Sequence, residues 1–261
     1  MAYRHLSVDR QKGVVRVDLD RPEVRNAFNN VMIHELYTLF TDLAEDEDVR
    51  VVILGGKGKV FCAGADIHWM RSSIEYTREE NFEDALRMAA MLDAIDRCPV
   101  PVIARVHRAA FGGALGLIAA SDIAVASSDT KFCFSEVRLG ILPAVISTFS
   151  IRKIGIGQAR RFFLTGEVFD AEQAYAMGLI HAVTPPDKLD SVVDEFVKSI
   201  FQVGPRAVRE AKRLLRILPT IEPSERLRYC AETIARVRVT PEAQAGLKAF
   251  LDRQPPPWVK A

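Results

Sequence analysis

Two glycine-containing turns, each placed directly after an apolar run, are the first places in this sequence where chemistry could occur. The first turn is FCAGAD (residues 61–66), and the second is FGGALG (residues 111–116). Small residues let a ligand approach the backbone closely, and amide groups at the start of a helix have no partner inside the helix. Two such amides would form an oxyanion hole, in which one donor stabilises a transition state by about 3–4 kcal/mol. The alternative is that these glycines only permit tight packing, and spacing alone leaves both interpretations open.

The side chains suited to nucleophilic or metal chemistry do not form a recognisable group. The four cysteines show no C-x-x-C pair and no histidine at metal-ligand spacing: Cys62, Cys98, Cys133 and Cys230. Cys62 could be a nucleophile, but free cysteines are usually small buried residues, and we expect that role. The five histidines are scattered, so we expect no metal site, and we do not expect His107 to contact a substrate.

Composition argues against several classes of protein. The chain has 35 basic and 34 acidic residues, so nothing global suggests binding to nucleic acid or to an acidic membrane. It has no apolar stretch of about 18 residues, and its first residues lack the pattern of a secretory signal. We therefore expect a cytoplasmic protein that does not enter membranes. Its 261 residues suffice for one large domain, with or without a small appendage.

The apolar pattern predicts the elements that must position the two turns. Apolar or alternating runs predict strands at residues 14–19, 51–54, 102–106, 123–126 and 131–135. Helical spacing predicts helices at 27–43 and 82–98, one opening within 110–120, and after residue 139 only helices: 147–154, 157–164, 171–177, 188–202, 206–218, 222–237 and 241–251. This order predicts an α/β core over residues 1–200, followed by a helical region over residues 201–261.

Taken in order, several segments resemble the enoyl-CoA hydratase/isomerase (crotonase) superfamily. The resemblance runs from DRPEVRNAF through FCAGAD, AAFGGALGLIAASDIAVA, FCFSEVRLGILP and ARRFFLTGEVFDAEQAYAMGLI to GLKAFLDRQPP, which is nearly the whole chain. It implies an α/β crotonase-like spiral of ββα units, with a C-terminal helical trimerisation region, assembled as a homotrimer or a dimer of trimers. It implies an acyl-CoA thioester as substrate, with its enolate held by the amides of Ala65 and Gly113. It implies no cofactor beyond the CoA of the substrate.

The resemblance also identifies Glu136 as the catalytic acid/base. Family hydratases hold a water between two glutamates, but the position of the first is Gly116 here, and only the second, Glu136, is present. A lone glutamate can still orient a water and move the α-proton. It is also what Δ3,Δ2-enoyl-CoA isomerases use, because a double-bond shift needs one base and no water. One hypothesis is that a carboxylate of the substrate itself helps to hold the water in the space left at Gly116.

A narrower resemblance favours hydration. FGGALGLI, SEVRLGILPAVIS and RYCAETIARVRVTPEAQAGLKAFL resemble bacterial methylglutaconyl-CoA hydratases of leucine breakdown and isohexenylglutaconyl-CoA hydratases of acyclic terpene breakdown. This implies a hydratase of a 3-branched α,β-unsaturated acyl-CoA, in leucine, terpene or fatty acid metabolism. Arg138 and Lys131 are candidates to bind a substrate carboxylate only because they are near Glu136 in the sequence.

Contacts to CoA and to the acyl chain follow from the same resemblance. It places the CoA ribose and pyrophosphate beside Glu23, Val24 and Arg25, and the adenine and pantetheine beside Ala63 and Ile67. Further contacts fall in and near the turns and at the C-terminus: Gly64, Asp66, Gly112, Gly116, Phe250 and Arg253, the last two often reaching a neighbouring subunit. Pro143, Ala144 and Val145 would line the acyl pocket, while Trp69 and Met70 would line it or pack in the core.

Two other patterns support different functions less well. The basic stripe RAVREAKRLLR (residues 206–216) could bind RNA, but the near-zero net charge and the lack of interleaved aromatic residues favour a solvated helix face. KIGIGQARR (residues 153–161) contains G-x-G, but no strand precedes it, so a junction between helices is expected rather than a dinucleotide site. We therefore expect no nucleic acid partner.

Overall fold

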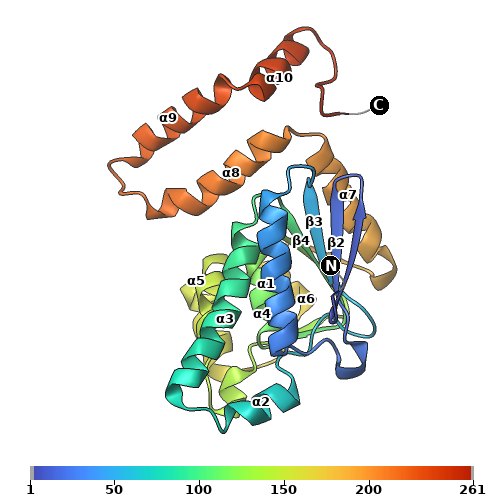
Figure 1. The fold of residues 1–261 in the computed structure, drawn as a ribbon, viewed down its shortest axis with the longest axis vertical. Coiled ribbons are helices and arrows are strands. Elements are labelled where there is room, and N and C mark those ends of the chain that lie inside the picture. Colours follow the sequence, from blue (N-terminus) through green and yellow to red (C-terminus); the bar gives the residue numbers. More distant parts are fainter. Residues whose placement is uncertain (1–2, 260–261) are drawn as a thin grey trace.

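A six-stranded twisted sheet forms the centre of the molecule in the computed structural model, which describes residues 3–259 (Figure 1). Its strands lie in the order β1 (Leu6–Gln11), β2 (Val14–Leu19), β3 (Val51–Gly56), β4 (Val102–Val106), β6 (Ile123–Ser127) and β9 (Ala182–Thr184). The β1–β2 pair is an antiparallel hairpin, and every other pair in this sheet is parallel. Lys12 and Gly13 make the hairpin turn with φ of 47° and 84°, the positive values that a tight two-residue turn requires.

Helices cover both faces of this sheet. β3 is buried along its whole length, and its alternate side chains face opposite sides. Val52 and Leu54 join the main core, and Val51 and Ile53 pack against a second cluster that includes Leu189. The main core is built with α1 (Asn30–Glu45), α3 (Arg78–Arg97), α4 (Ala114–Ala120) and α5 (Ala144–Thr165), and the second cluster with α7 (Leu189–Phe201).

A small second sheet fixes the segment that precedes Glu136. It contains β5 (Ala109–Phe111), β7 (Lys131–Cys133) and β8 (Phe169–Asp170). Phe132 of β7 stacks on Phe169 of β8 with ring centroids 5.5 Å apart, and Phe162 lies 4.5 Å from Phe169. These aromatic contacts hold the chain just before the short 3-10 helix η2 (Glu136–Leu139), which Glu136 begins.

The C-terminal helices form an arm beyond the sheet (Figure 1). They are α8 (Pro205–Ile217), α9 (Arg226–Arg238) and α10 (Pro241–Leu251), and none of the three contains a buried residue. Two cations of the basic stripe attach α8 to the core. Arg209 donates to the carbonyls of Asp46 and Val49, and Lys212 Nζ lies 2.6 Å from an Asp122 carboxylate oxygen. The expectation that this stripe is only a solvated helix face is therefore wrong for these two residues.

The predicted order of elements needs four corrections. β1 was not expected, and β8 and β9 contradict the expectation that only helices follow residue 139. The helices expected at 147–154 and 157–164 are one helix, α5, kinked at Gly155, where φ is 70° and ψ is 161°. α2 (Ile67–Ser73) was also not expected, whereas α6 (Ala171–Ala176) was. Among residues 3–259, no helix has the length and apolar character needed to cross a bilayer.

Candidate active site

The two glycine-containing turns lie against each other. The Cys62 amide donates to the Ala109 carbonyl at 3.1 Å, and the Phe111 amide donates back to the Cys62 carbonyl at 3.1 Å. Gly64 has φ of +99°, and a Cβ there would lie 2.9 Å from the Phe111 carbonyl oxygen. Any side chain at Gly64 would therefore strain the backbone and push the turns apart, so packing and the close approach both require glycine.

Backbone amides of both turns are left without an internal acceptor. Within the part of the chain that the structure describes, the N–H groups of Ala65 and Gly113 donate to no protein atom, and the adjoining amides of Gly64 and Ala114 are also without an acceptor. The Asp66 amide donates to the Phe28 carbonyl at 2.8 Å, and the Gly112 amide donates to the Cys133 carbonyl at 2.9 Å. Ala65 and Gly113 both line one cavity of about 370 Å³. Two amides of this kind on one cavity are what an oxyanion hole requires.

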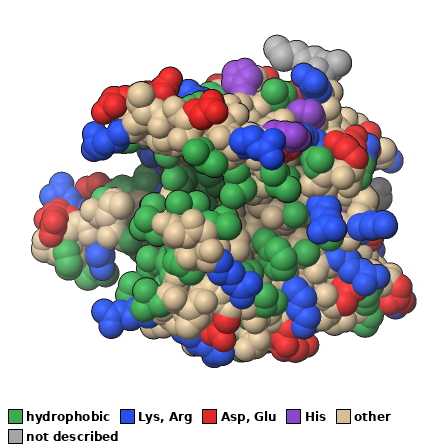
Figure 2. Space-filling model, turned by 90° about the horizontal axis from the view of Figure 1, so that it is seen from below, with side chains coloured by type: hydrophobic (Ala, Val, Ile, Leu, Met, Phe, Trp, Pro, Cys, Tyr) green, Lys and Arg blue, Asp and Glu red, His purple; other side chains and the backbone are tan. Residues whose placement is uncertain are grey.

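The cavity is apolar apart from these amides, the residues at its Glu136 side and the indole of Trp69, whose Nε1 is buried without a hydrogen-bond partner in the described structure. It opens on the face that carries α2, where a space-filling view shows a hollow among hydrophobic side chains (Figure 2). Its walls are Phe28, Ala63, Gly64, Ala65, Trp69, Met70, Ala85, Met88, Gly112, Gly113, Ser135, Glu136, Leu139, Ile141, Leu142, Pro143, Ala144, Val145 and Ile146. Glu136 is the one ionisable side chain in this set, and no lysine, arginine or histidine is among them.

The carboxylate of Glu136 lies beside the second turn. A Cβ on Gly112 would lie 3.5 Å from Glu136 Oε1, and Glu136 Oε2 is buried without a hydrogen-bond partner in the described structure. Burial raises the pKa of Glu136 above the ordinary value for glutamate, because desolvation disfavours the charged form. A carboxylate with a raised pKa beside two free amides is suited to accept a proton and return it.

A model of the enoyl-CoA hydratase/isomerase family matches residues 9–261. The chain belongs to this family. A crystal structure of an enoyl-CoA hydratase from Shewanella pealeana has a TM-score of 0.94 and 39% identity, covering 98% of this chain and 96% of that one. The enoyl-CoA hydratase ACTT6 of Alternaria alternata is 36% identical over 79% of this chain and 67% of its own length. A trans-2-decenoyl-[acyl-carrier-protein] isomerase of Streptococcus mutans is 27% identical over 82% of each chain. The crotonase fold predicted from the sequence is confirmed.

The space beside Gly116 is closed. A Cβ at Gly116 would lie 2.6 Å from Ile146 Cγ2 and 3.0 Å from Leu92 Cδ1, and Gly116 is not among the residues that line the cavity. The hypothesis that a substrate carboxylate holds water in this space therefore finds no room. Arg138 and Lys131 are both exposed and also do not line the cavity, so their nearness to Glu136 in sequence does not bring them into it.

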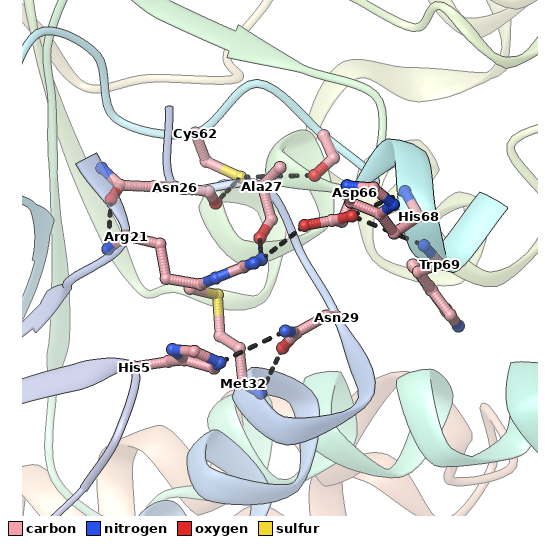
Figure 3. A network of polar contacts seen from close by, with 11 residues as sticks. His5, Arg21, Asn26, Ala27, Asn29, Met32, Cys62, Asp66, His68 and Trp69 are labelled. Atoms are coloured by element: carbon pink, nitrogen blue, oxygen red, sulfur yellow. Dashed lines mark hydrogen bonds and ion pairs between the residues drawn. The ribbon is translucent and has the colours of Figure 1, made fainter. Parts of the chain in front are cut away.

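A buried polar network holds the first turn in place (Figure 3). Arg21 Nη1 donates to the Ala27 carbonyl at 2.7 Å and lies 2.8 Å from the Asp66 carboxylate. The same carboxylate caps α2 by accepting from the His68 amide at 2.7 Å. The Asp66 side chain is thus fully engaged next to Ala65, and it positions the turn rather than facing the cavity.

Asn26 completes this network. Its side chain is fully buried and donates from Nδ2 to the carbonyls of Lys57, Val60 and Phe61, while its Oδ1 accepts from the Arg21 amide. Asn26 has φ of 55°, a conformation that asparagine tolerates better than most residues. Sequence reasoning missed the roles of Arg21 and Asn26, although both lie in the DRPEVRNAF segment that carries the resemblance. Their contacts form a buried polar cluster between two loops, and a single sequence does not show which loops meet.

The expected CoA contacts lie in several parts of the molecule. Ala63, Gly64, Gly112 and Pro143 line the cavity. Glu23 and Val24 form the 3-10 helix η1 (Pro22–Val24), and the Arg25 carbonyl accepts from the Ala63 amide at 3.0 Å, so this loop adjoins the first turn. Ile67 is 73% exposed at the start of α2.

Two other expected CoA contacts lie on the arm. Phe250, at the end of α10, is 81% exposed, and Arg253 follows that helix; neither lines the cavity of its own subunit.

Cys62 and His107 have potentially reactive side chains, but neither lines the candidate cavity. Cys62 is fully buried, and its Sγ lies 3.0 Å from the Asn26 carbonyl. Burial raises the pKa of the Cys62 thiol to about 12, so it stays protonated and is a poor nucleophile. His107 Nε2 lies 3.2 Å from the Gly58 carbonyl oxygen and faces a different surface hollow. The burial of Cys62 agrees with the structural role expected from the sequence.

Proposed function

We propose that this chain is an enoyl-CoA hydratase in which the Ala65 and Gly113 amides hold the thioester oxygen and Glu136 moves one proton. The observation that carries the proposal is the convergence of three groups on one cavity. Two acceptor-free amides and a buried carboxylate oxygen without a partner all belong to residues that line the same apolar space. Buried polar groups are normally paired, so unpaired ones that share a cavity point to a ligand.

The reaction follows from what these groups can do. Hydrogen bonds to the thioester oxygen draw electrons from the conjugated double bond and make C3 electrophilic. The oxygen of a water forms a bond to C3 while Glu136 accepts the proton that this water loses. The double-bond electron pair moves into an enolate held by the two amides. Glu136 then returns the proton to C2, which leaves a 3-hydroxyacyl thioester and the starting enzyme.

A Δ3,Δ2-enoyl-CoA isomerase is the second candidate. Gly116 supplies no second carboxylate, and Ile146 and Leu92 close the space where one could point. Glu136 alone could take a proton from C2 of a 3-enoyl thioester and return it at C4 through the same enolate. The Streptococcus mutans relative is named as an isomerase, so both reactions occur among the proteins that this chain resembles.

For the substrate, we propose a 3-branched acyl group, as in 3-methylglutaconyl-CoA or isohexenylglutaconyl-CoA. Support for a branched acyl group comes from the apolar residues after Glu136, since Leu139, Ile141 and Leu142 all line the cavity. The distal carboxylate of a glutaconyl group has less support. A buried charge needs a partner, and no cationic side chain of residues 3–259 lines the cavity within one subunit.

A panel of thioesters tests this proposal. It contains 3-methylglutaconyl-CoA, isohexenylglutaconyl-CoA, crotonyl-CoA, a 3-enoyl-CoA, and 3-methylcrotonyl-CoA as the uncharged match for 3-methylglutaconyl-CoA. Rapid water addition to the 3-branched members but not to crotonyl-CoA would support the branched hydratase. The ratio of the hydration rate of 3-methylglutaconyl-CoA to that of 3-methylcrotonyl-CoA would then show whether the enzyme recognises the distal carboxylate. Double-bond migration in the 3-enoyl thioester with no hydration of any member would make the chain an isomerase.

We also propose that the C-terminal arm assembles the chain into a homotrimer or a dimer of trimers. The arm exposes large apolar side chains that its own subunit leaves uncovered, including Leu227 at 85%, Phe250 at 81% and Leu251 at 78%. Light scattering after gel filtration should give a trimeric or hexameric mass, and Phe250→Asp should lower it. A monomeric wild type would contradict this proposal.

The RNA-binding alternative has lost part of its basis, because Arg209 and Lys212 are engaged with the core. Retention of RNA that persists at physiological ionic strength and falls with added salt would revive it.

A further inference from the structure

Ser135 is a serine at the start of a helix that does not act as a cap. It is the N-cap residue of η2, yet its side chain makes no capping hydrogen bond. Serine is favoured at this position because its oxygen normally accepts from a backbone N–H in the first turn. Its hydroxyl also has no other hydrogen-bond partner among residues 3–259, and Ser135 lines the same cavity as Glu136.

The Ser135 hydroxyl and the Glu136 carboxylate converge on one point of the second turn. A Cβ on Gly112 would lie 3.3 Å from Ser135 Oγ and 3.5 Å from Glu136 Oε1. Both oxygens therefore lie beside Gly112, next to the free amide of Gly113. The φ of +54° at Gly112 disfavours a side chain there for a second reason.

The surrounding packing fixes the backbone that carries this hydroxyl. Phe134 is fully buried, and its ring lies 4.6 Å from that of Phe163. Cys133 Sγ lies 3.0 Å from the Gly166 carbonyl, and a Cβ on Gly166 would lie 3.0 Å from Val137 Cγ2. Ser135 thus sits between anchored neighbours on both sides, as a group that orients a reactant should.

We propose that Ser135 Oγ positions the water that Glu136 deprotonates, in place of the second carboxylate that Gly116 lacks. This inference rests on the proposed hydratase function. A hydroxyl has two acceptor lone pairs and one donor. Ser135 accepts a hydrogen bond from one O–H of the water, Glu136 accepts the other proton, and the water oxygen bonds to C3. The double-bond pair moves into the enolate at the Ala65 and Gly113 amides, and the O–H bonded to Ser135 remains as the hydroxyl of the product.

The test compares a step that uses water as nucleophile with one that does not. Both are measured on Ser135→Ala: hydration of the best thioester of the panel, and exchange of the α-proton of its saturated analogue in D₂O. We expect kcat for hydration to fall by about 10- to 100-fold, the range for losing one positioned hydrogen bond in a transition state. Proton exchange should stay within about twofold, because Glu136 and the two amides suffice for it.

Two further variants separate positioning from structure. Ser135→Thr keeps a hydroxyl and should recover most of the hydration rate. Ser191→Ala removes an exposed serine hydroxyl of α7 that bonds only to the Lys188 carbonyl, and it should change neither rate. Equal losses of hydration and exchange in Ser135→Ala, or no loss of hydration, would overturn the inference while the hydratase proposal stands. A wild type that adds water to no thioester would overturn both.

Discussion

The cavity beside Glu136 and the groove under the C-terminal arm differ in how their polar groups are engaged. The groove, of about 830 Å³, is bordered by α8, α9 and α10 and is the larger of the two. Several of its polar groups are engaged. Arg236 makes two hydrogen bonds to Glu210, at 3.0 and 2.7 Å, and Glu242 accepts from the Arg206 and Ala207 amides. The smaller cavity instead has two free amides and an unpartnered carboxylate oxygen.

Unpaired polar groups gathered around one cavity, rather than the size of that cavity, distinguish the candidate site in this molecule. An unpaired buried polar group destabilises the folded state, so several of them around one cavity indicate a ligand that pairs with them on binding. The groove carries no such group among its lining residues and exposes apolar side chains instead. Its features are those of a surface for assembly, whereas the cavity has those of a site for reaction.

Disrupting the contact between the two turns of the cavity should have the largest effect on catalysis. In Gly64→Ala the new methyl would lie 2.9 Å from the Phe111 carbonyl oxygen, at a φ of +99°. The turn would move and misplace the Ala65 amide, so we expect kcat to fall by about 100- to 1000-fold, as for the loss of one oxyanion donor. Steady-state kinetics at saturating thioester measure this. Gly157→Ala makes the same chemical change in α5, where nothing lies within 4 Å of the new methyl, and should leave kcat unchanged. Equal kcat values for Gly64→Ala and Gly157→Ala would show that catalysis does not depend on the first turn.

Restoring the missing carboxylate should damage the fold rather than improve hydration. Gly116→Glu would drive a side chain into Ile146 and Leu92. We expect overpacking to lower the free energy of unfolding by about 1–3 kcal/mol, with no gain in hydration rate. Thermal melting and turnover of the variant check both parts. A variant that keeps wild-type stability and hydrates faster would show that the cavity extends to this position.

A smaller effect should be seen on the stability of the folded protein, which the unpaired carboxylate of Glu136 lowers when it is ionised. The folded-state pKa of Glu136 is raised by burial, so the folded protein favours the protonated form. Its contribution to stability is therefore full below the ordinary glutamate pKa and is lost as pH rises through the folded-state value. Glu136→Gln should raise the melting temperature by about 2–4 °C near pH 8, equivalent to roughly 1 kcal/mol. The difference should vanish as pH falls toward 4. A difference that grows on acidification would contradict the raised pKa.

The smallest effect should come from the paired groups of the groove. Glu210→Gln removes one partner of a partly exposed ion pair, whose contribution is about 0–1 kcal/mol. We expect turnover within about twofold of wild type and a barely changed melting temperature. A loss of turnover comparable to that of Gly64→Ala would mean that the groove takes a direct part in catalysis.

Sequence reasoning predicted the parts of this molecule that depend on local pattern. β2, β3, β4, β6 and β7 have apolar runs that mark buried strands, and the two turns stand out because of their glycines. β8 and β9 have two and three residues and are set by tertiary pairing, which a short segment does not display. The closure of Gly116 by Ile146 and Leu92, and the buried contacts of Asn26, join residues far apart in the chain. No periodicity within one segment could reveal them.

The central claim is that Glu136 and the amides of Ala65 and Gly113 form and discharge an enolate. Exchange of the α-proton of butyryl-CoA in D₂O, followed by NMR for the wild type and for Glu136→Gln, tests it most directly. This exchange needs only the enolate that hydration and isomerisation share, so the result does not depend on which of the two reactions the protein catalyses. We predict measurable exchange with the wild type and a loss of about 100-fold or more with Glu136→Gln, while butyryl-CoA still binds with similar affinity. Exchange at the wild-type rate in Glu136→Gln would contradict the account, because another group would then be the base.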